Sequence, residues 1–127
     1  LGDWDCVTEM GKARNQITRE YNDAVILERF TILPPINWSG MSVTTYDDQA
    51  GWRKSWVDQD GNHWAFVGQK VDGDPSFATV GPVDADQLFK RMVFSEIEED
   101  RLHWRWEVSP DEVEWSVRMT VAYTRRD

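Results

Sequence analysis

The spacing of the tryptophans constrains this chain more than any other feature. Eight of its 127 residues are tryptophan, and several recur at alternating positions, as in Trp104-Arg105-Trp106 and Trp52-Arg53-Lys54-Ser55-Trp56. Successive side chains of a β-strand point to opposite faces, so this spacing places indoles on one face and charges on the other. The pattern predicts a sheet with one apolar and one hydrated face.

Short β-rich runs alternate with turn residues about every ten positions, as in antiparallel barrels and sandwiches. No run keeps the period of an amphipathic helix, and a chain of this length can build one core but not two. We therefore predict that residues 1–127 form one all-β domain, a closed antiparallel barrel of about eight to ten strands in up-and-down order. The predicted strands cover residues 3–10, 14–21, 24–33, 38–46, 52–58, 63–71, 76–81, 87–97, 101–108 and 113–124.

The charge balance narrows the classes of partner. A formal net charge of −9 repels phosphate backbones and anionic lipid surfaces, so we expect neither nucleic acid nor a membrane as a partner. Cys6 is the single cysteine and cannot form an internal disulfide, which favours a cytoplasmic location. No signal peptide is recognisable, although a first residue of Leu1 rather than Met is compatible with removal of a leader or tag.

The alternation also predicts how the last hairpin is registered. A four-residue loop over 109–112 would place Trp106 opposite Trp115 and Leu102 opposite Met119, so that every inward pair is apolar. A slip of one residue would send all of these side chains to the other face.

Two other turns fix further pairs. A three-residue loop over 59–61, with a left-handed glycine, pairs Trp56 with Trp64, whereas a two-residue turn would split the aromatic rings between faces. A two-residue turn at Glu99-Asp100 would place Val93 opposite Trp106 and turn Arg91 inward.

The two ends of the chain resemble a known superfamily. Gly2-Asp3-Trp4 matches the Gly-x-Trp signature of the lipocalins, or calycins, and Arg125 matches the arginine that packs across that tryptophan. Counting by twos along the last strand favours Arg125 over Arg126. The resemblance implies a barrel closed at its base by Trp4 and Arg125.

The middle of the chain is similar to small bacterial lipocalin-like domains of unknown function, which are related to nitrobindin-type barrels. The similarity lies in Ser39-Gly40-Met41, Thr45-Tyr46-Asp47, Gly51-Trp52, Trp56-Val57-Asp58 and Gly61. Nitrobindin-type proteins bind haem through a histidine on a late strand. The predicted strand 113–124 contains none, and His103 falls on an outward phase, so we expect no haem, no other cofactor and no metal site.

The predicted inward face defines the candidate ligand-binding residues. These are Met41, Trp52, Trp56, Trp64, Phe66, Arg91, Trp104, Trp106, Trp115 and Met119. Such a cluster of rings either fills a solid core or lines a cavity for a flat apolar molecule. Arg91 and Lys54 would anchor a carboxylate or phenolate, or would extend to the barrel mouth. A buried arginine needs an acidic partner, and the pattern leaves open whether Glu28 or Arg29 points inward.

We predict a non-catalytic protein that binds a small hydrophobic or aromatic ligand as a monomer or a homodimer, with Met92 and Phe94 as an outward dimer patch. One alternative is an isomerase or cyclase of the same fold, with Tyr46 or Glu28 moving protons. A haem-binding barrel and a structural module without a pocket are further alternatives. The sequence has no Gly-rich phosphate loop, no Cys-x-x-Cys and no Gly-x-Ser-x-Gly elbow.

Overall fold

The computed structural model describes residues 1–126, which form ten β-strands and no helix. The strands are β1 (Gly2–Thr8), β2 (Gly11–Glu20), β3 (Val25–Ile32), β4 (Trp38–Asp47), β5 (Gly51–Asp58), β6 (His63–Val71), β7 (Asp74–Thr79), β8 (Phe89–Ser95), β9 (Arg101–Ser109) and β10 (Ser116–Arg125). Every predicted run corresponds to one of them, with ends that differ by a few residues.

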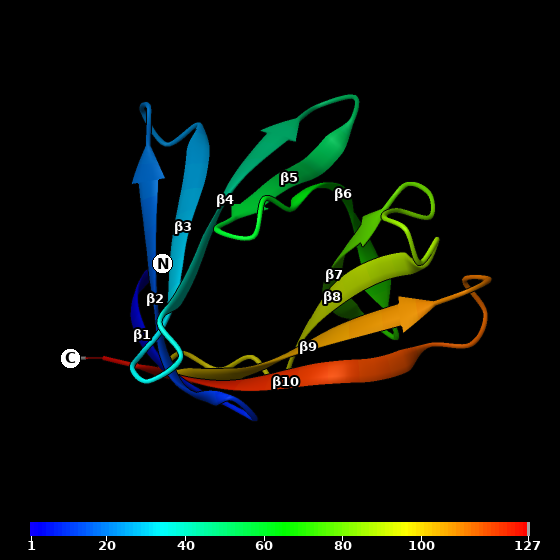
Figure 1. Cartoon of the computed structure of the whole chain (residues 1–127). Coiled ribbons are helices and arrows are strands. Elements are labelled where there is room, and N and C mark those ends of the chain that lie inside the picture. Colours follow the sequence, from blue (N-terminus) through cyan, green and yellow to red (C-terminus); the bar gives the residue numbers. More distant parts are fainter. Residues whose placement is uncertain (127) are drawn as a thin grey trace.

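The strands form a closed antiparallel barrel in which each pairs with its neighbours in the chain and β1 pairs with β10. Figure 1 shows them following one another around the barrel, with the first strand beside the last. Closure removes the unpaired edges that an open sheet of this size would present. The predicted fold class and up-and-down order are confirmed. No helix in residues 1–126 is long and apolar enough to span a membrane.

Alternation along each strand decides which side chains enter the interior. In β1 the buried positions are Trp4, Cys6 and Thr8, and the residues between them are exposed. The same alternation in β2, β3 and β10 gives one buried cluster made of Trp4, Cys6, Ala13, Phe30, Ile32, Val121 and Tyr123. This cluster is the apolar core that holds the first, second, third and last strands together.

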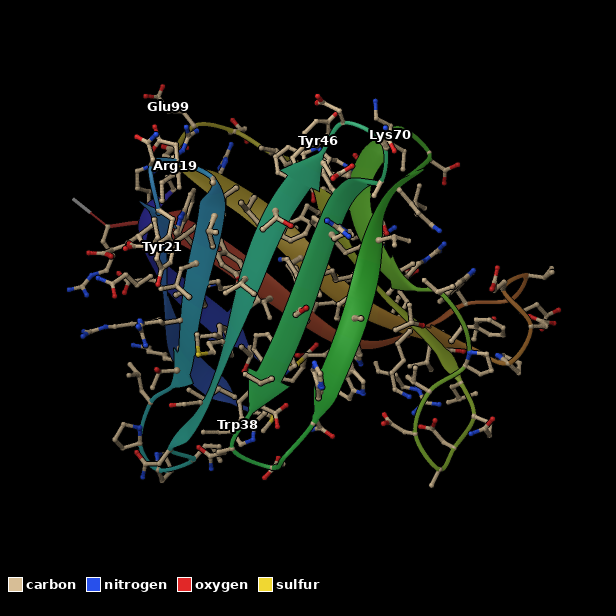
Figure 2. The ribbon with its side chains drawn as sticks, turned by 90° about the horizontal axis from the view of Figure 1, so that it is seen from above. Arg19, Tyr21, Trp38, Tyr46, Lys70 and Glu99 are labelled. Carbon is tan, nitrogen blue, oxygen red and sulfur yellow. The ribbon has the colours of Figure 1, made fainter. Side chains whose placement is uncertain are left out.

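The barrel has two distinct ends, which Figure 2 identifies through its labels. Trp38 lies at one end, and Tyr46 and Lys70 lie at the other. We name them the Trp38 end and the Tyr46 end. The connection between β5 and β6 lies at the Trp38 end, because Gly40 pairs with Asp58 in the ladder that runs back to Trp38.

The hairpin of β5 and β6 has the predicted register. Trp56 pairs with Trp64 and Lys54 pairs with Phe66. The loop contains Gly61 with a φ of +81°, and the Gly61 N–H donates to the Asp58 carbonyl. A left-handed residue is needed here, which is why glycine fits.

The predicted register of β8 and β9 is wrong by one residue. Met92 pairs with Trp106, and Arg91 pairs with Glu107. The Glu98 N–H still donates to the Arg101 carbonyl, as the predicted tight turn requires. However, Glu96 has a φ of +49° and adds one residue between this turn and the ladder. Such a bulge moves every side chain of the strand to the other face.

The predicted register of β9 and β10 is also wrong, because the connecting loop is longer than four residues. Its backbone N–H groups are bound by two side chains: Ser109 Oγ accepts from residues 111 and 112, and Asp111 Oδ1 accepts from residues 113 and 114. The wider loop excludes Trp115 from the strand, and Met119 pairs with Trp106 after a bulge. The register of β10 is shifted in total by an even number of residues at Met119. Because side chains alternate between faces, Met119 keeps its predicted inward face.

Candidate functional site

An aromatic cavity of about 200 Å³ opens at the Trp38 end of the barrel. We call it the aromatic chamber. Its lining is apolar except for two carboxylates, an amide and a phenol. The lining residues are Glu28, Phe30, Trp38, Trp56, Asp58, Asn62, Trp64, Phe66, Met92, Trp104, Trp106, Met119, Val121 and Tyr123.

Two stacks of indoles contribute to the walls of this chamber. Trp38 and Trp56, from β4 and β5, stack with their centroids 6.1 Å apart. Trp106 of β9 stacks against Trp64 at 5.4 Å and against Trp104 at 6.2 Å. Offset stacking of this kind stabilises aromatic pairs beyond the area that they bury.

The indole N–H groups of three wall residues are directed at carboxylates of the rim. Trp38 donates to Asp60 at 2.8 Å, Trp56 to Asp58 at 2.8 Å and Trp64 to Asp84 at 2.9 Å. The Trp56 bond is partly buried, whereas the Trp38 and Trp64 bonds lie at the exposed rim, and each satisfies the polar edge of its ring. The rings are therefore held in place before any ligand arrives.

Asp58 keeps its negative charge at the rim. Burial raises the pKa of its carboxyl, but hydrogen bonds from Trp56, Asn62 and Asp60 outweigh burial and lower the pKa overall. All of these donors are neutral groups, so the charge is dispersed but not cancelled.

Glu28 lies at the inner boundary of the aromatic chamber, which settles the question that the sequence left open. Its carboxylate accepts from Asn15 Nδ2 at 2.5 Å and Ser42 Oγ at 2.7 Å, and Lys54 Nζ lies 3.7 Å away. Burial raises the pKa of the Glu28 carboxyl, but the charge of Lys54 and the two hydrogen bonds outweigh burial and lower the pKa overall. The carboxyl is therefore ionised near neutral pH.

The Glu28 network continues into the core. Asn15 Nδ2 also donates to the Tyr123 hydroxyl at 2.9 Å. Burial, with the Glu28 charge, raises the pKa of Tyr123 well above its usual range and that of Cys6 to about 12. Both groups are therefore neutral at physiological pH, and Cys6 serves as a buried apolar residue.

A second, wider cavity of about 680 Å³ lies at the Tyr46 end. We call it the lysine chamber, because Lys54 lies deep inside it with only 8% of its surface exposed. Glu28 lines both chambers. The other lining residues are Leu1, Ile17, Ile26, Ser42, Thr44, Trp52, Gly68, Gln69, Lys70, Pro75, Ser76, Phe77 and Phe94.

The structure brings together most of the residues that the tryptophan pattern singled out. Trp56, Trp64, Phe66, Trp104, Trp106 and Met119 line the aromatic chamber, whereas Trp52 lines the lysine chamber. Sequence reasoning missed Trp38, although it shares the phase of Gly40 and Ser42 on β4. The inward contribution of Phe30 was missed because the alternation of the third strand was not resolved.

Arg91 and Trp115 lie outside the barrel, contrary to the prediction. The Arg91 guanidinium is 3.9 Å from the Trp115 ring and donates to Glu107 at 2.6 Å. Arg105 also donates to Glu107. Burial raises the pKa of Glu107, but these two guanidinium groups lower it overall. The bulge at Glu96 and the wide loop after Ser109 explain the change of face.

Met41 also points away from both chambers, because the inward phase of β4 is that of Trp38, Gly40, Ser42 and Thr44. Ser42 pairs with Trp56, and Thr44 pairs with Lys54. Small residues are needed opposite these long side chains. The outward patch predicted for Met92 and Phe94 is wrong as well, since they line the aromatic and the lysine chamber respectively.

Trp4 and Arg125 are in contact, as the resemblance implied. The Arg125 guanidinium lies 4.3 Å from the Trp4 ring centroid, and the two residues pair across β1 and β10. A Cβ atom on Gly2 would lie 2.8 Å from Arg125 Nη1. The Arg125 side chain could move to avoid this atom, but the φ of +106° at Gly2 favours glycine two residues before the tryptophan.

The histidines do not fit haem ligation. His63 pairs with the outward Val57, and His103 is exposed and lies 3.6 Å from Glu96. Neither lines the aromatic chamber. Within residues 1–126, no group of three or more His, Cys, Asp and Glu side chains is arranged to hold a metal ion.

Comparison with protein-family models gives no match for this chain, and comparison with curated proteins gives no significant match either. The closed antiparallel barrel of β1 to β10 is therefore established by the structure itself.

Proposed function

We propose that the barrel binds a small, flat, mainly apolar molecule in the aromatic chamber and does not transform it. The observation that carries the proposal is the set of five inward tryptophans, three of which are fixed by rim carboxylates. Preorganised walls reduce the ordering cost of binding. An apolar cavity of about 150 Å³ accommodates benzene, so a chamber of about 200 Å³ suits one or two fused rings.

The lining also favours one class of charge. Glu28 and Asp58 line the chamber, whereas no lysine or arginine among residues 1–126 does so. A neutral or cationic ring is therefore favoured over an anionic one. We expect tryptamine to displace indole from the chamber more effectively than indole-3-propionate does, as measured by competition calorimetry.

A matched pair of tryptophan substitutions tests the proposal, with indole as the probe. Trp106→Ala removes the ring that stacks against both Trp64 and Trp104. Trp115→Ala removes an indole that lies outside the barrel. We expect about tenfold or greater weakening of indole binding for Trp106→Ala and none for Trp115→Ala, by titration calorimetry. Equal affinities in the two variants would rule out the aromatic chamber as the site.

A filling substitution separates loss of binding from loss of folding. Met119→Trp replaces one lining side chain with a larger ring and keeps all five tryptophans of the chamber. We expect indole binding to be lost and the far-ultraviolet circular dichroism of the barrel to be kept. Unchanged affinity would contradict the proposed location.

We also infer that this barrel is a relative of the lipocalin-like, or calycin, barrels and of the nitrobindin-type domains among them. The contact of Trp4 with Arg125, and the positive φ of Gly2 beside it, support this relationship. A crystal structure in which Trp4 and Arg125 are apart would argue against it.

A further inference from the structure

We propose that the lysine chamber is a second binding site, which takes an organic carboxylate with an apolar body. It lies at the opposite end of the barrel from the aromatic chamber and has different chemistry. Its walls include Ile17, Ile26, Trp52, Phe77 and Phe94. A cavity of about 680 Å³ is within the usual range for sites of small organic ligands.

The Lys54 ammonium is the first feature that points to an anionic ligand. It lies 3.7 Å from Glu28 Oε1 and 3.8 Å from the sulfur of Met92. Charge-assisted N–H···O bonds are typically about 2.7–2.9 Å long, so the ammonium lacks a short oxygen partner among the described residues. Its other close neighbours are the rings of Phe77 and Phe94, at 4.7 and 5.4 Å.

Thr44 supplies a second donor at the same depth. It pairs directly with Lys54 across β4 and β5, and 6% of its surface is exposed. Both side chains line the lysine chamber, and the Thr44 hydroxyl makes no hydrogen bond within residues 1–126. Because the hydroxyl lines the chamber beside Lys54, it is available to a bound ligand. Together, the two groups form an anchor for the two oxygens of a carboxylate.

The apolar walls and the depth of the anchor define the ligand class. Because Lys54 is more than nine-tenths buried, a ligand must bring its charged group into the barrel and surround it with apolar surface. Inorganic anions cannot cover the walls, and a neutral lipid brings no charge that could share the ammonium with Glu28. A monocarboxylate with an aliphatic or aromatic body does both.

Glu28 sets the strength of this site. Its carboxylate shares the Lys54 ammonium and lines the same chamber. A bound carboxylate would therefore experience repulsion, which the hydrogen bonds from Asn15 and Ser42 only partly offset. Glu28→Gln is expected to strengthen the binding of a carboxylate.

The experiment compares octanoate with 1-octanol by titration calorimetry at pH 7. We expect octanoate to bind the native protein about tenfold or more tightly than 1-octanol. Thr44→Val removes the hydroxyl but keeps the shape and the ion pair, and should reduce octanoate affinity by about threefold to tenfold. Thr45→Val is the matched control, since Thr45 is the outward neighbour and lines neither chamber.

Removal of the charge needs a second change, because Lys54→Met alone would leave Glu28 buried and unpaired. The double variant Lys54→Met with Glu28→Gln should bind octanoate and 1-octanol equally. The proposal is overturned if the native protein does not distinguish the two ligands, or if Thr44→Val and Thr45→Val behave alike.

The outcome is independent of the function proposed for the aromatic chamber. Because Glu28 lines both chambers, the two sites are electrostatically coupled, but saturating octanoate should leave indole bound to the same molecule, and Trp106→Ala should weaken indole binding far more than octanoate binding. Displacement of indole by octanoate would place both ligands in the aromatic chamber and overturn the second site.

Discussion

At the scale of single residues, the shape of the aromatic chamber depends on the absence of a side chain at Gly40. A Cβ atom there would overlap the Trp56 ring and lie 3.0 Å from the Cβ of Asp58. Gly40→Ala should destabilise the barrel by about 1–3 kcal/mol, because overpacking displaces the ring, and should weaken indole binding. Chemical denaturation measures the first effect. Gly81→Ala is the control, since nothing lies near its added Cβ.

Glu28 makes stability depend on pH. Burial raises the pKa of this carboxyl, but Lys54, Asn15 and Ser42 lower it below its usual value of 4.5. A carboxyl with a depressed folded-state pKa stabilises the fold above its unfolded pKa and loses that contribution as the pH falls. The free energy of unfolding should therefore decrease as the pH drops below about 4.5.

Urea titrations from pH 7 to pH 3 measure this dependence. Other carboxyls with depressed pKa values, among them Glu107 and Asp58, contribute to the same range. The informative quantity is thus the difference in the free energy of unfolding between the native protein and Glu28→Gln. This difference should shrink as the pH falls. A constant difference would exclude the ion pair with Lys54 as its source.

Cys6 offers a probe of the same core. Its thiol pKa is raised to about 12, first by burial and then by the charge of Glu28. Since the thiolate is the reactive form, iodoacetamide should alkylate native Cys6 slowly at pH 8 and much faster in denaturing urea. Equal rates in the two conditions would show that the core of Trp4, Cys6 and Tyr123 is open to solvent.

At the scale of elements, the loop between β9 and β10 is a separate unit attached to the outside of the barrel. Trp115 stacks on Arg91, and Arg91 is held by Glu107. A double-mutant cycle with Arg91→Ala and Trp115→Ala should give a coupling energy of about 0.5–2 kcal/mol. A coupling of zero by urea denaturation would show that the stack contributes nothing to stability.

The elements also show how far the sequence alone leads. Strand number, order and the β5–β6 register were predictable, because alternation and a glycine in the turn agree on one face. The β8 register was not, because Met92 and Phe94 alternate with Arg91 and Val93 and both sets include apolar residues. The extra residue at Glu96 determines which of the two sets faces inward. The positive φ of Glu96 cannot be recognised from the alternation of apolar and polar residues.

The candidate site shows a second limit of sequence reasoning. In β4 the phase of Met41 was the expected lining. The inward phase instead contains Ser42 and Thr44, because large partners from β5 occupy the space opposite them. Which phase faces inward is decided by the volume of residues on another strand, and this cannot be read from β4 by itself.

At the scale of the whole molecule, Arg125 connects three parts of the barrel. Its guanidinium lies over Trp4, its Nη1 donates to the Leu1 carbonyl and its Nε donates to the Glu99 carbonyl. Arg125→Ala should cost about 1–2 kcal/mol in the free energy of unfolding. Arg126→Ala, which loses only an exposed ion pair with Asp5, should stay within about 0.5 kcal/mol. Thermal unfolding of the two variants compares them.

The pairing of β1 with β10 joins residues from opposite ends of the chain. The outer edge of β1 therefore stays unpaired until β10 has formed. Until then, a nascent or refolding chain has two sheet edges with unpaired backbone groups. Contacts this distant in sequence slow folding to about milliseconds or seconds. During that interval the edges of two incomplete copies can join each other, so recovery after denaturation should fall as the protein concentration rises.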